Sequence, residues 1–295
     1  MSDAPHPDRE PGRSAPTFLV IGGQKCGTTW LAEMVAQHPE VATPGRKELH
    51  FFDVPASAAT GREGYCRQFP EPGPGERAVG EFTPDYLYAT EPAGGRSVAG
   101  QVRKWFPEIR LVVCLRDPVE RALSALHHHQ RKGRVPAGTD PFTAPPELGI
   151  LDKGRYADHL APWLEHFPRE QLLVLFHERE MADEHKAETM RRVFTHLGVD
   201  PDFLPAHLYQ RYNARRDDPA TWLSRLPLVG NHPGLWHPLV GALARLRREL
   251  PGVTATTRRD LAAYYREPNR ALARLLQAEP PWPEAADETA SGAAQ

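Results

Sequence analysis

The sequence predicts an α/β protein in which helices cover both faces of a central, mostly parallel sheet, giving three layers (α/β/α). Short apolar runs, which are typical of strands buried on both faces, alternate along the chain with longer amphipathic stretches, which are typical of helices. In addition, a glycine-rich turn at 22–27 joins the first apolar run directly to the first amphipathic stretch. This strand–turn–helix order is the one from which parallel sheets are built.

The predicted elements follow one another along most of the chain. Pro118 begins a helix, because proline suits the first helical turn, and Gly198 ends one, because glycine tolerates the left-handed conformation that follows a helix. Strands are expected at 18–21, 41–42, 78–82, 109–115 and 171–176, and helices from 28 onward and at 97–106, 118–130, 156–167, 184–197 and 257–277.

These elements are expected to form a single domain, residues 17–278. The chain has 295 residues, enough for one sizeable core, and no repeat or linker divides it. Residues 1–16 and 279–295 are rich in proline, charged and small residues, so we predict a disordered arm and a disordered tail. The Gly/Pro-rich stretch 132–149 is long for a connection, which favours a lid or a wall of the substrate site.

Composition excludes several classes of protein. The net charge is −2, so no global basic field indicates a nucleic-acid partner. The three cysteines, Cys26, Cys66 and Cys114, are too few and too scattered for a disulfide framework or a zinc site. No apolar run approaches the length of about 18 residues that a membrane helix needs, and no signal-peptide pattern opens the chain. We therefore expect a cytoplasmic protein without a membrane span.

The turn after the first strand has the features of an anion-binding site. Its sequence, Gln24-Lys25-Cys26-Gly27-Thr28-Thr29, leads into a helix whose first backbone N–H groups are free and whose dipole is positive at this end. Lys25 adds a full charge, and the two threonines add hydroxyl donors. The turn is predicted to bind a phosphorylated compound, the alternative being an ordinary strand–helix connection.

The position of the lysine separates this turn from a nucleoside-triphosphate loop. That loop has the order G-x-x-x-x-G-K-[ST], with the lysine directly after the second glycine. Here Lys25 comes before Gly27, and Thr28 stands where the lysine would be. Because a glycine-rich turn still joins a strand to a helix, we expect a P-loop-like fold. The displaced lysine indicates a ligand other than a magnesium–nucleotide complex.

A second phosphate contact is predicted directly after the strand at 109–115. Arg116 follows the carboxyl end of this strand, which faces the ligand crevice in parallel α/β sheets. Ser124 lies two turns along the next helix and can reach the same crevice. A guanidinium and a hydroxyl suit a terminal phosphate. The alternative is a surface pair of Arg116 with Asp117 and a solvated serine.

Together these two motifs resemble the sulfotransferases that use 3′-phosphoadenosine 5′-phosphosulfate (PAPS), and most closely the heparan-sulfate glucosaminyl sulfotransferase-like branch with its soluble bacterial relatives. The resemblance implies that the loop residues Gln24 to Thr29 hold the 5′-phosphosulfate, and that Arg116 and Ser124 hold the 3′-phosphate. It covers about residues 17–276 and includes Tyr156, Leu160 and Trp163 and the run 264–269. The family's late basic loop falls near Arg248, with Arg258 as a competing candidate.

A candidate base lies in the stretch Lys47-Glu48-Leu49-His50-Phe51-Phe52. If this stretch is extended, Glu48 and His50 point to the same face, because side chains alternate along a strand. A carboxylate beside an imidazole suits removal of a proton from an acceptor hydroxyl. The resemblance places the family's catalytic base on Glu48, with His50 beside it and Lys25 stabilising charge on the bridging oxygen. The alternative is a Lys47–Glu48 ion pair beside a core histidine.

One position departs from the family pattern. Many relatives carry Glu-Lys-Thr-Pro where this chain has Glu81-Phe82-Thr83-Pro84. The loss of this lysine predicts an aromatic wall at Phe82 and an apolar or aromatic acceptor, or else a slow or inactive enzyme. The consecutive histidines 127–129 are not expected to hold a metal, because neighbouring helical residues point in different directions.

The predicted function is transfer of the sulfuryl group from PAPS to a hydroxyl or amine of a small molecule or glycan, with no metal required. Two other functions stay open at this point. One is a kinase-like phosphotransferase, against which the position of Lys25 argues. The other is a non-catalytic module that binds a nucleotide.

Overall fold

A parallel five-stranded sheet forms the centre of the computed structural model, which describes residues 15–88, 97–209 and 253–282. The strand order is β2-β3-β1-β4-β5, and every neighbouring pair is parallel. This confirms the predicted fold class. The strands are β1 (Phe18–Gly22), β2 (Val41–Ala42), β3 (Ala78–Phe82), β4 (Arg110–Leu115) and β5 (Leu172–Phe176).

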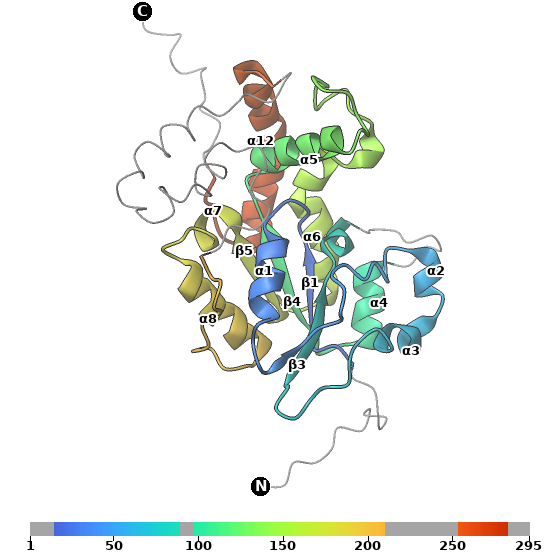
Figure 1. Cartoon of the computed structure of the whole chain (residues 1–295). Helices are drawn as coiled ribbons and strands as arrows, with labels where there is room; N and C mark the ends of the chain where they lie inside the picture. The colour runs from blue at the N-terminus through green and yellow to red at the C-terminus, as the bar shows by residue number, and fades with distance from the viewer. Residues whose placement is uncertain (1–14, 89–96, 210–252, 283–295) are drawn as a thin grey trace, which may run out of the picture.

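Helices lie on both faces of this sheet. Helices α1 and α8 pack together on one side, and α4 lies with α6 on the other (Figure 1). The helices are α1 (Thr28–Val35), α2 (Pro55–Ala58), α3 (Gly61–Cys66), α4 (Val98–Trp105), α5 (Pro118–Arg131), α6 (Tyr156–His166), α7 (His177–Glu180), α8 (Lys186–Leu197) and α12 (Ala255–Leu276), with 3₁₀ turns at Pro84–Tyr88, Pro146–Leu148, Asp152–Gly154 and Arg169–Gln171. None of the helices within the described ranges is long and apolar enough to cross a membrane.

The strands are apolar because both faces of the sheet are covered. All five residues of β1 are buried, and β4 is buried from its second residue onward. Burying one such side chain contributes about 1.5–3 kcal/mol, so an uninterrupted apolar run is what a central parallel strand requires. The short runs were therefore sufficient to predict these strands to within a residue or two.

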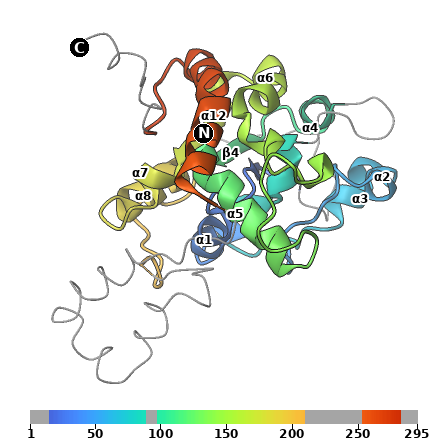
Figure 2. The ribbon, with the colours of Figure 1, turned by 90° about the horizontal axis from the view of Figure 1, so that it is seen from above.

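The strand order determines where a ligand can bind. From β1 the chain runs to β2 at the edge of the sheet, returns to β3 beside β1, and then crosses to β4 and β5 on the other side of β1. The order thus reverses between β1 and β4, and in such sheets the crevice outside the carboxyl ends at this point is the usual ligand site. The loop after β1 and Arg116 after β4 both lie there. Seen from above, α5 and α12 lie next to each other over this end of the sheet (Figure 2).

Local capping explains where the helix α5 begins. The Asp117 carboxylate accepts hydrogen bonds from the N–H groups of Val119 (2.8 Å) and Glu120 (3.2 Å), and Pro118 occupies the first helical position. An N-cap of this kind contributes about 0.5–2 kcal/mol. Asp117 is therefore used as a helix cap and not as the surface partner of Arg116.

The buried part of the chain continues past the predicted end of the domain. Most of the predicted arm and tail (1–14 and 283–295) lies outside the described residues. Trp282, however, was assigned to the tail and is buried. Its ring lies 5.8 Å from that of Tyr156 and 5.6 Å from that of Phe176, and its Nε1 donates to Glu178 (2.9 Å). The packed chain thus extends at least to this tryptophan.

Candidate active site

The loop between β1 and α1 presents free donors to the crevice. No hydrogen bond joins the N–H groups of Gly27, Thr28 and Thr29 to a described residue. Gly27 has φ 94°, and a Cβ there would strike Met181 and His177, so only glycine fits. Free N–H groups at a helix N-terminus attract an anion. The turn therefore offers unpaired backbone donors of the kind that can bind an anion.

Two residues of the predicted loop are turned inward instead. The N–H of Gln24 donates to the Tyr88 hydroxyl (3.2 Å), and the N–H of Cys26 donates to the carbonyl of Gly23 (3.2 Å). The Cys26 thiol is fully buried, and its Sγ lies 3.6 Å from the Tyr156 hydroxyl. Burial raises the pKa of this thiol to about 11. The backbone groups of Gln24 and Cys26 thus hold the loop in shape, and a ligand meets the residues around them.

Lys25 is a cation without a counter-charge in the part of the chain that the structure describes. Its backbone is left-handed (φ 68°), its side chain is half-buried, and no hydrogen bond or ion pair joins its ammonium to a described residue. Burial, followed by the charges of Arg116 and Arg131, lowers the pKa of Lys25. A half-buried cation of this kind is stabilised when an anion binds beside it.

Arg116 lies against the same loop. Its Nη1 donates to the carbonyl of Lys25 (3.4 Å), and Glu120 and Glu178 lie 3.8 and 4.0 Å from the guanidinium. Its Nε is buried and has no hydrogen-bond partner among the described residues. This unused N–H can donate to an additional anionic oxygen. Arg116 and the loop lie far apart along the chain, and the fold brings them together.

The other residues predicted to contact the 3′-phosphate are Ser124 and a late arginine, either Arg248 or Arg258. Ser124 is half-buried on α5, two turns after the helix begins. Arg248 lies outside the described residues. The competing candidate, Arg258 at the start of α12, is paired with Glu120, which also faces Arg116.

A histidine that the sequence analysis did not select lies near Lys25. His128 is four residues after Ser124 and so shares its face of α5. Burial, followed by the charge of Lys25, lowers the pKa of His128 to about 4. It was considered only as a metal ligand, and its spacing from Ser124 was the signal that could have found it.

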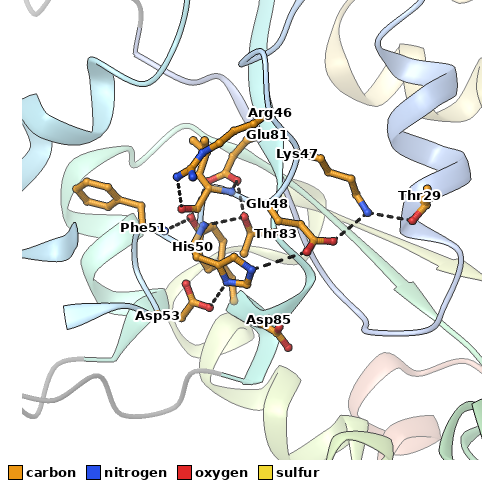
Figure 3. A network of polar contacts seen from close by, with 12 residues as sticks. Thr29, Arg46, Lys47, Glu48, His50, Phe51, Asp53, Glu81, Thr83 and Asp85 are labelled. Atoms are coloured by element: carbon orange, nitrogen blue, oxygen red, sulfur yellow. Dashed lines mark hydrogen bonds and ion pairs between the residues drawn. The ribbon is translucent and has the colours of Figure 1, made fainter. Parts of the chain in front are cut away.

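The candidate base lies in a bent, irregular segment and not in an extended one. Glu48 has φ 65° and His50 has φ 51°, so the strand-like alternation that we expected is wrong. The two side chains are nevertheless adjacent, with His50 Nε2 3.7 Å from Glu48 Oε2 (Figure 3). His50 Nδ1 lies 2.7 Å from Asp53 Oδ2. Burial alone would lower the pKa of His50, but the hydrogen bond and charge of Asp53 raise it overall.

The expected ion pair of Lys47 with Glu48 is also present. Lys47 Nζ donates to Glu48 Oε1 (3.1 Å) and to Thr29 Oγ1 (3.0 Å) (Figure 3). His50, by contrast, is 36% exposed in its side chain and is no core residue. The ion pair and the candidate base are therefore parts of one arrangement rather than alternatives, and Lys47 connects it to the anion-binding loop.

Glu81 helps to anchor the segment that carries Glu48 and His50. Its buried carboxylate accepts hydrogen bonds from the hydroxyls of Tyr65 (2.7 Å), Tyr86 (2.7 Å) and Thr83 (2.6 Å), and from the N–H of Leu49 (3.4 Å). Burial raises the pKa of Glu81, while these hydrogen bonds act in the opposite direction.

Two further N–H groups tie the turn to the same set of side chains. That of His50 donates to Thr83 Oγ1 (3.4 Å), and that of Phe51 donates to the Tyr86 hydroxyl (3.0 Å). Together with Leu49, three consecutive residues are thus anchored. We call Glu81, Tyr65, Tyr86 and Thr83 the carboxylate hub.

The predicted aromatic wall at Phe82 is wrong. Phe82 is 4% exposed, and its ring packs edge-on against Phe18 of the neighbouring strand β1 (5.8 Å between centroids). Alternation along β3 turns it away from the hub that Glu81 forms on the other face. Phe82 belongs to the core, so its identity says nothing about the acceptor.

Three side chains near the candidate base are close enough to share a cation. His50, Asp53 and Asp85 each offer one ligand atom, and these atoms lie within 4.8 Å of one another. Their charges already have protein partners, since Asp53 faces His50 and Asp85 accepts from Lys153 Nζ (2.6 Å). No sequence motif had indicated this group of three residues.

Comparison with known proteins identifies relatives over most of the chain. The family model described as "Sulfotransferase domain" matches residues 15–228. Heparan sulfate glucosamine 3-O-sulfotransferase 6 from Homo sapiens is 32% identical over 245 residues, which cover 78% of this chain and 67% of the relative. Heparan sulfate glucosamine 3-O-sulfotransferase 3A1 from Mus musculus is 29% identical, over 78% of this chain and 58% of the relative. The chain thus spans little more than half the length of several curated relatives that it matches.

A solved structure supports the same architecture. The crystal structure of a sulfotransferase from Alicyclobacillus acidocaldarius matches 90% of this chain and 97% of its own, with a TM-score of 0.64 and 23% sequence identity. At this identity the likeness shows the fold.

Proposed function

This chain belongs to the sulfotransferase domain family, and we propose that it transfers the sulfuryl group of PAPS to a hydroxyl or an amine of a small molecule or glycan. One observation carries the proposal: a carboxylate, Glu48, is joined through the ammonium of Lys47 to Thr29 of the anion-binding loop. A base is therefore held beside the place where a phosphosulfate would bind. The kinase-like alternative has no comparable observation in its favour.

The residues around the crevice suit PAPS as the co-substrate, which supplies a sulfuryl group activated by its bond to phosphate. Free N–H groups follow Gly27, Lys25 has no counter-charge among the described residues, and the buried Nε of Arg116 lacks a partner. Each of these is satisfied by an anionic oxygen. Lys25, Gly27, Thr28 and Thr29 would hold the phosphosulfate end, and Arg116 with Ser124 would hold the second phosphate.

Glu48 would accept the proton of the acceptor. Its side chain is 41% exposed, so an acceptor can reach it. His50 lies beside it, and Asp53 orients the imidazole ring of His50. Lys25 would stabilise the negative charge that grows on the phosphate oxygen as the sulfuryl group leaves. Positioning and electrostatics account for much of the acceleration of group transfer of this kind. The proposal requires no metal ion, because the cations of the chain serve this purpose.

The acceptor belongs to the proposal only as a class. The relatives' names specify glucosamine of heparan sulfate, which makes an amino-sugar glycan one candidate. A small alcohol, phenol or amine is the other. We also propose a cytoplasmic location, which fractionation of the producing cells would test.

The direct test is incubation with labelled PAPS and a panel of glycan, phenol and lipid acceptors. Transfer of label by the wild-type protein, lost in Glu48→Gln but kept in Glu165→Gln, is the expected result; Glu165 is an exposed residue of α6. Thermal shifts with 3′-phosphoadenosine 5′-phosphate (PAP) and with ATP accompany it. Stabilisation by ATP alone, without label transfer, would contradict the proposal and favour a kinase.

A further inference from the structure

The ammonium of Lys47 occupies the space between the anion-binding loop and the candidate base. It contacts Thr29 Oγ1 at 3.0 Å on one side and Glu48 Oε1 at 3.1 Å on the other (Figure 3). Its side chain is 27% exposed, so it lies at the rim of the crevice and not in the core. The ammonium of Lys47 thus connects the anion-binding loop directly to the candidate base.

We propose that Lys47 is a second catalytic cation, which contacts the sulfuryl group itself during transfer. This inference rests on the proposed function and adds a residue to its machinery. The sulfur–oxygen bond to the phosphate breaks, a sulfur–oxygen bond to the acceptor oxygen forms, and the acceptor proton goes to Glu48. The electron pair stays on the phosphate of PAP, and Lys47 keeps its proton throughout.

The donor capacity of Lys47 supports a direct contact. An ammonium group has three N–H donors. Two of them are used by Thr29 and Glu48, and the third has no acceptor among the described residues. A sulfuryl oxygen that lies between the loop and the base can take this third donor without breaking either existing hydrogen bond.

The surrounding charges leave Lys47 well placed for this task. Lys25 is near enough that the charge of Lys47 contributes to lowering the pKa of Lys25. Lys47 also contacts Thr29 of the anion-binding loop that carries Lys25, while Glu48 is the acid partner of Lys47 in the part of the chain that the structure describes. Position 82 of strand β3 is an uncharged phenylalanine that is buried in the core, so this strand supplies no cation there. The second positive charge comes from the turn that carries the base.

A simpler role has to be separated from this one, namely that Lys47 only positions Glu48. A double-mutant cycle does so. The rate of PAPS breakdown is measured with water as the acceptor, so that no knowledge of the natural acceptor is needed. The substitution Lys47→Gln is made in the wild type and in Glu48→Gln, with Lys47→Arg as the conservative variant and Lys104→Gln, an exposed lysine of α4, as the control.

We expect Lys47→Gln to lower the rate by about 10²–10³-fold, as for loss of one preorganised donor to a developing charge. The loss should be of similar size in the Glu48→Gln background, Lys47→Arg should recover part of it, and Lys104→Gln should behave as wild type. An effect that disappears in Glu48→Gln would overturn the proposal, because Lys47 would then act only through the base. No effect in either background would overturn it as well.

A binding measurement tests the same contact without turnover. Calorimetry with PAPS and with PAP compares ligands that differ only in the sulfuryl group. Lys47→Gln should reduce the preference for PAPS, whereas an unchanged ratio of the two affinities would refute the direct contact. A wild-type protein that binds neither ligand would instead contradict the proposed function, so the two failures are distinguishable.

Discussion

The carboxylate hub allows a stability difference to be derived from two nearly identical substitutions. Tyr65→Phe and Tyr86→Phe each remove one buried hydroxyl that donates to Glu81 at 2.7 Å. The Tyr86 hydroxyl also accepts the N–H of Phe51 at 3.0 Å. Loss of a hydrogen bond to a charged group costs about 1.5–3 kcal/mol, and a buried donor left without a partner costs a further 1–3 kcal/mol or so.

Tyr86→Phe should therefore lower the free energy of unfolding by about 1–3 kcal/mol more than Tyr65→Phe. Urea denaturation followed by tryptophan fluorescence measures both values, with Tyr65→Phe serving as the matched control. Because Phe51 follows the turn that carries Glu48 and His50, Tyr86→Phe should also reduce the transfer rate more than Tyr65→Phe does. Equal losses of stability would refute the reasoning, since they would mean that the Phe51 hydrogen bond contributes nothing.

Three other predictions concern the site directly. Arg116→Ala should weaken binding of PAP strongly but leave adenosine 5′-phosphosulfate, which lacks the 3′-phosphate, nearly unaffected in calorimetry; similar losses for both would remove Arg116 from the phosphate site. Glu48→Gln should lower transfer to an alkyl alcohol by about 10²–10⁴-fold, with partial rescue at high pH for a phenol, which ionises near pH 10. If Glu48→Gln transferred to the alcohol at the wild-type rate, the role of base would shift to His50. Asp53→Asn should destabilise the protein most at low pH, because Asp53 raises the pKa of His50 in the folded state. The stability that the His50–Asp53 pair contributes is complete below the unfolded pKa of about 6.5, and it is lost as the pH rises through the folded pKa. Unfolding curves of both proteins at pH 5.5 and 8.5 measure the loss of stability caused by Asp53→Asn. A loss of the same size at both pH values would contradict this prediction.

The fold was largely predictable because its strands are buried on both faces. Apolar runs in such strands are uninterrupted, and capping residues such as Pro118 and Gly198 mark helix ends within a residue or two. The short helices α2, α3 and α7 were not predicted. They span four to six residues, too few for an amphipathic repeat to show, and they depend on packing rather than on local propensity.

The site was predictable where it depends on the sheet and unpredictable where it depends on side-chain contacts. Lys25 and Arg116 were found because each follows the carboxyl end of a central strand. Lys47 was considered only as the partner of Glu48, because nothing in the sequence shows that the same ammonium reaches Thr29. Phe82 was misassigned for a related reason: the family pattern suggested which residue differs, but not which face of β3 it occupies.

The backbone of the site shows why its geometry could not be derived from local sequence. Four described non-glycine residues have positive φ: Lys25, Glu48, His50 and Gln277, the last of which ends α12. The other three are among the residues proposed to act in catalysis, together with Lys47. A non-glycine residue in this region costs of order 1 kcal/mol or more, so it persists only where the surrounding structure holds it. Around Glu48 and His50 this support comes from the carboxylate hub, which receives the N–H groups of three successive residues. An extended segment would satisfy the local backbone preference. It would, however, break the hydrogen bonds between these three N–H groups and the hub. The hub thus determines the position of the base, and its members lie on β3 and on the segments that pack around it, where no pattern near residue 48 can reveal them.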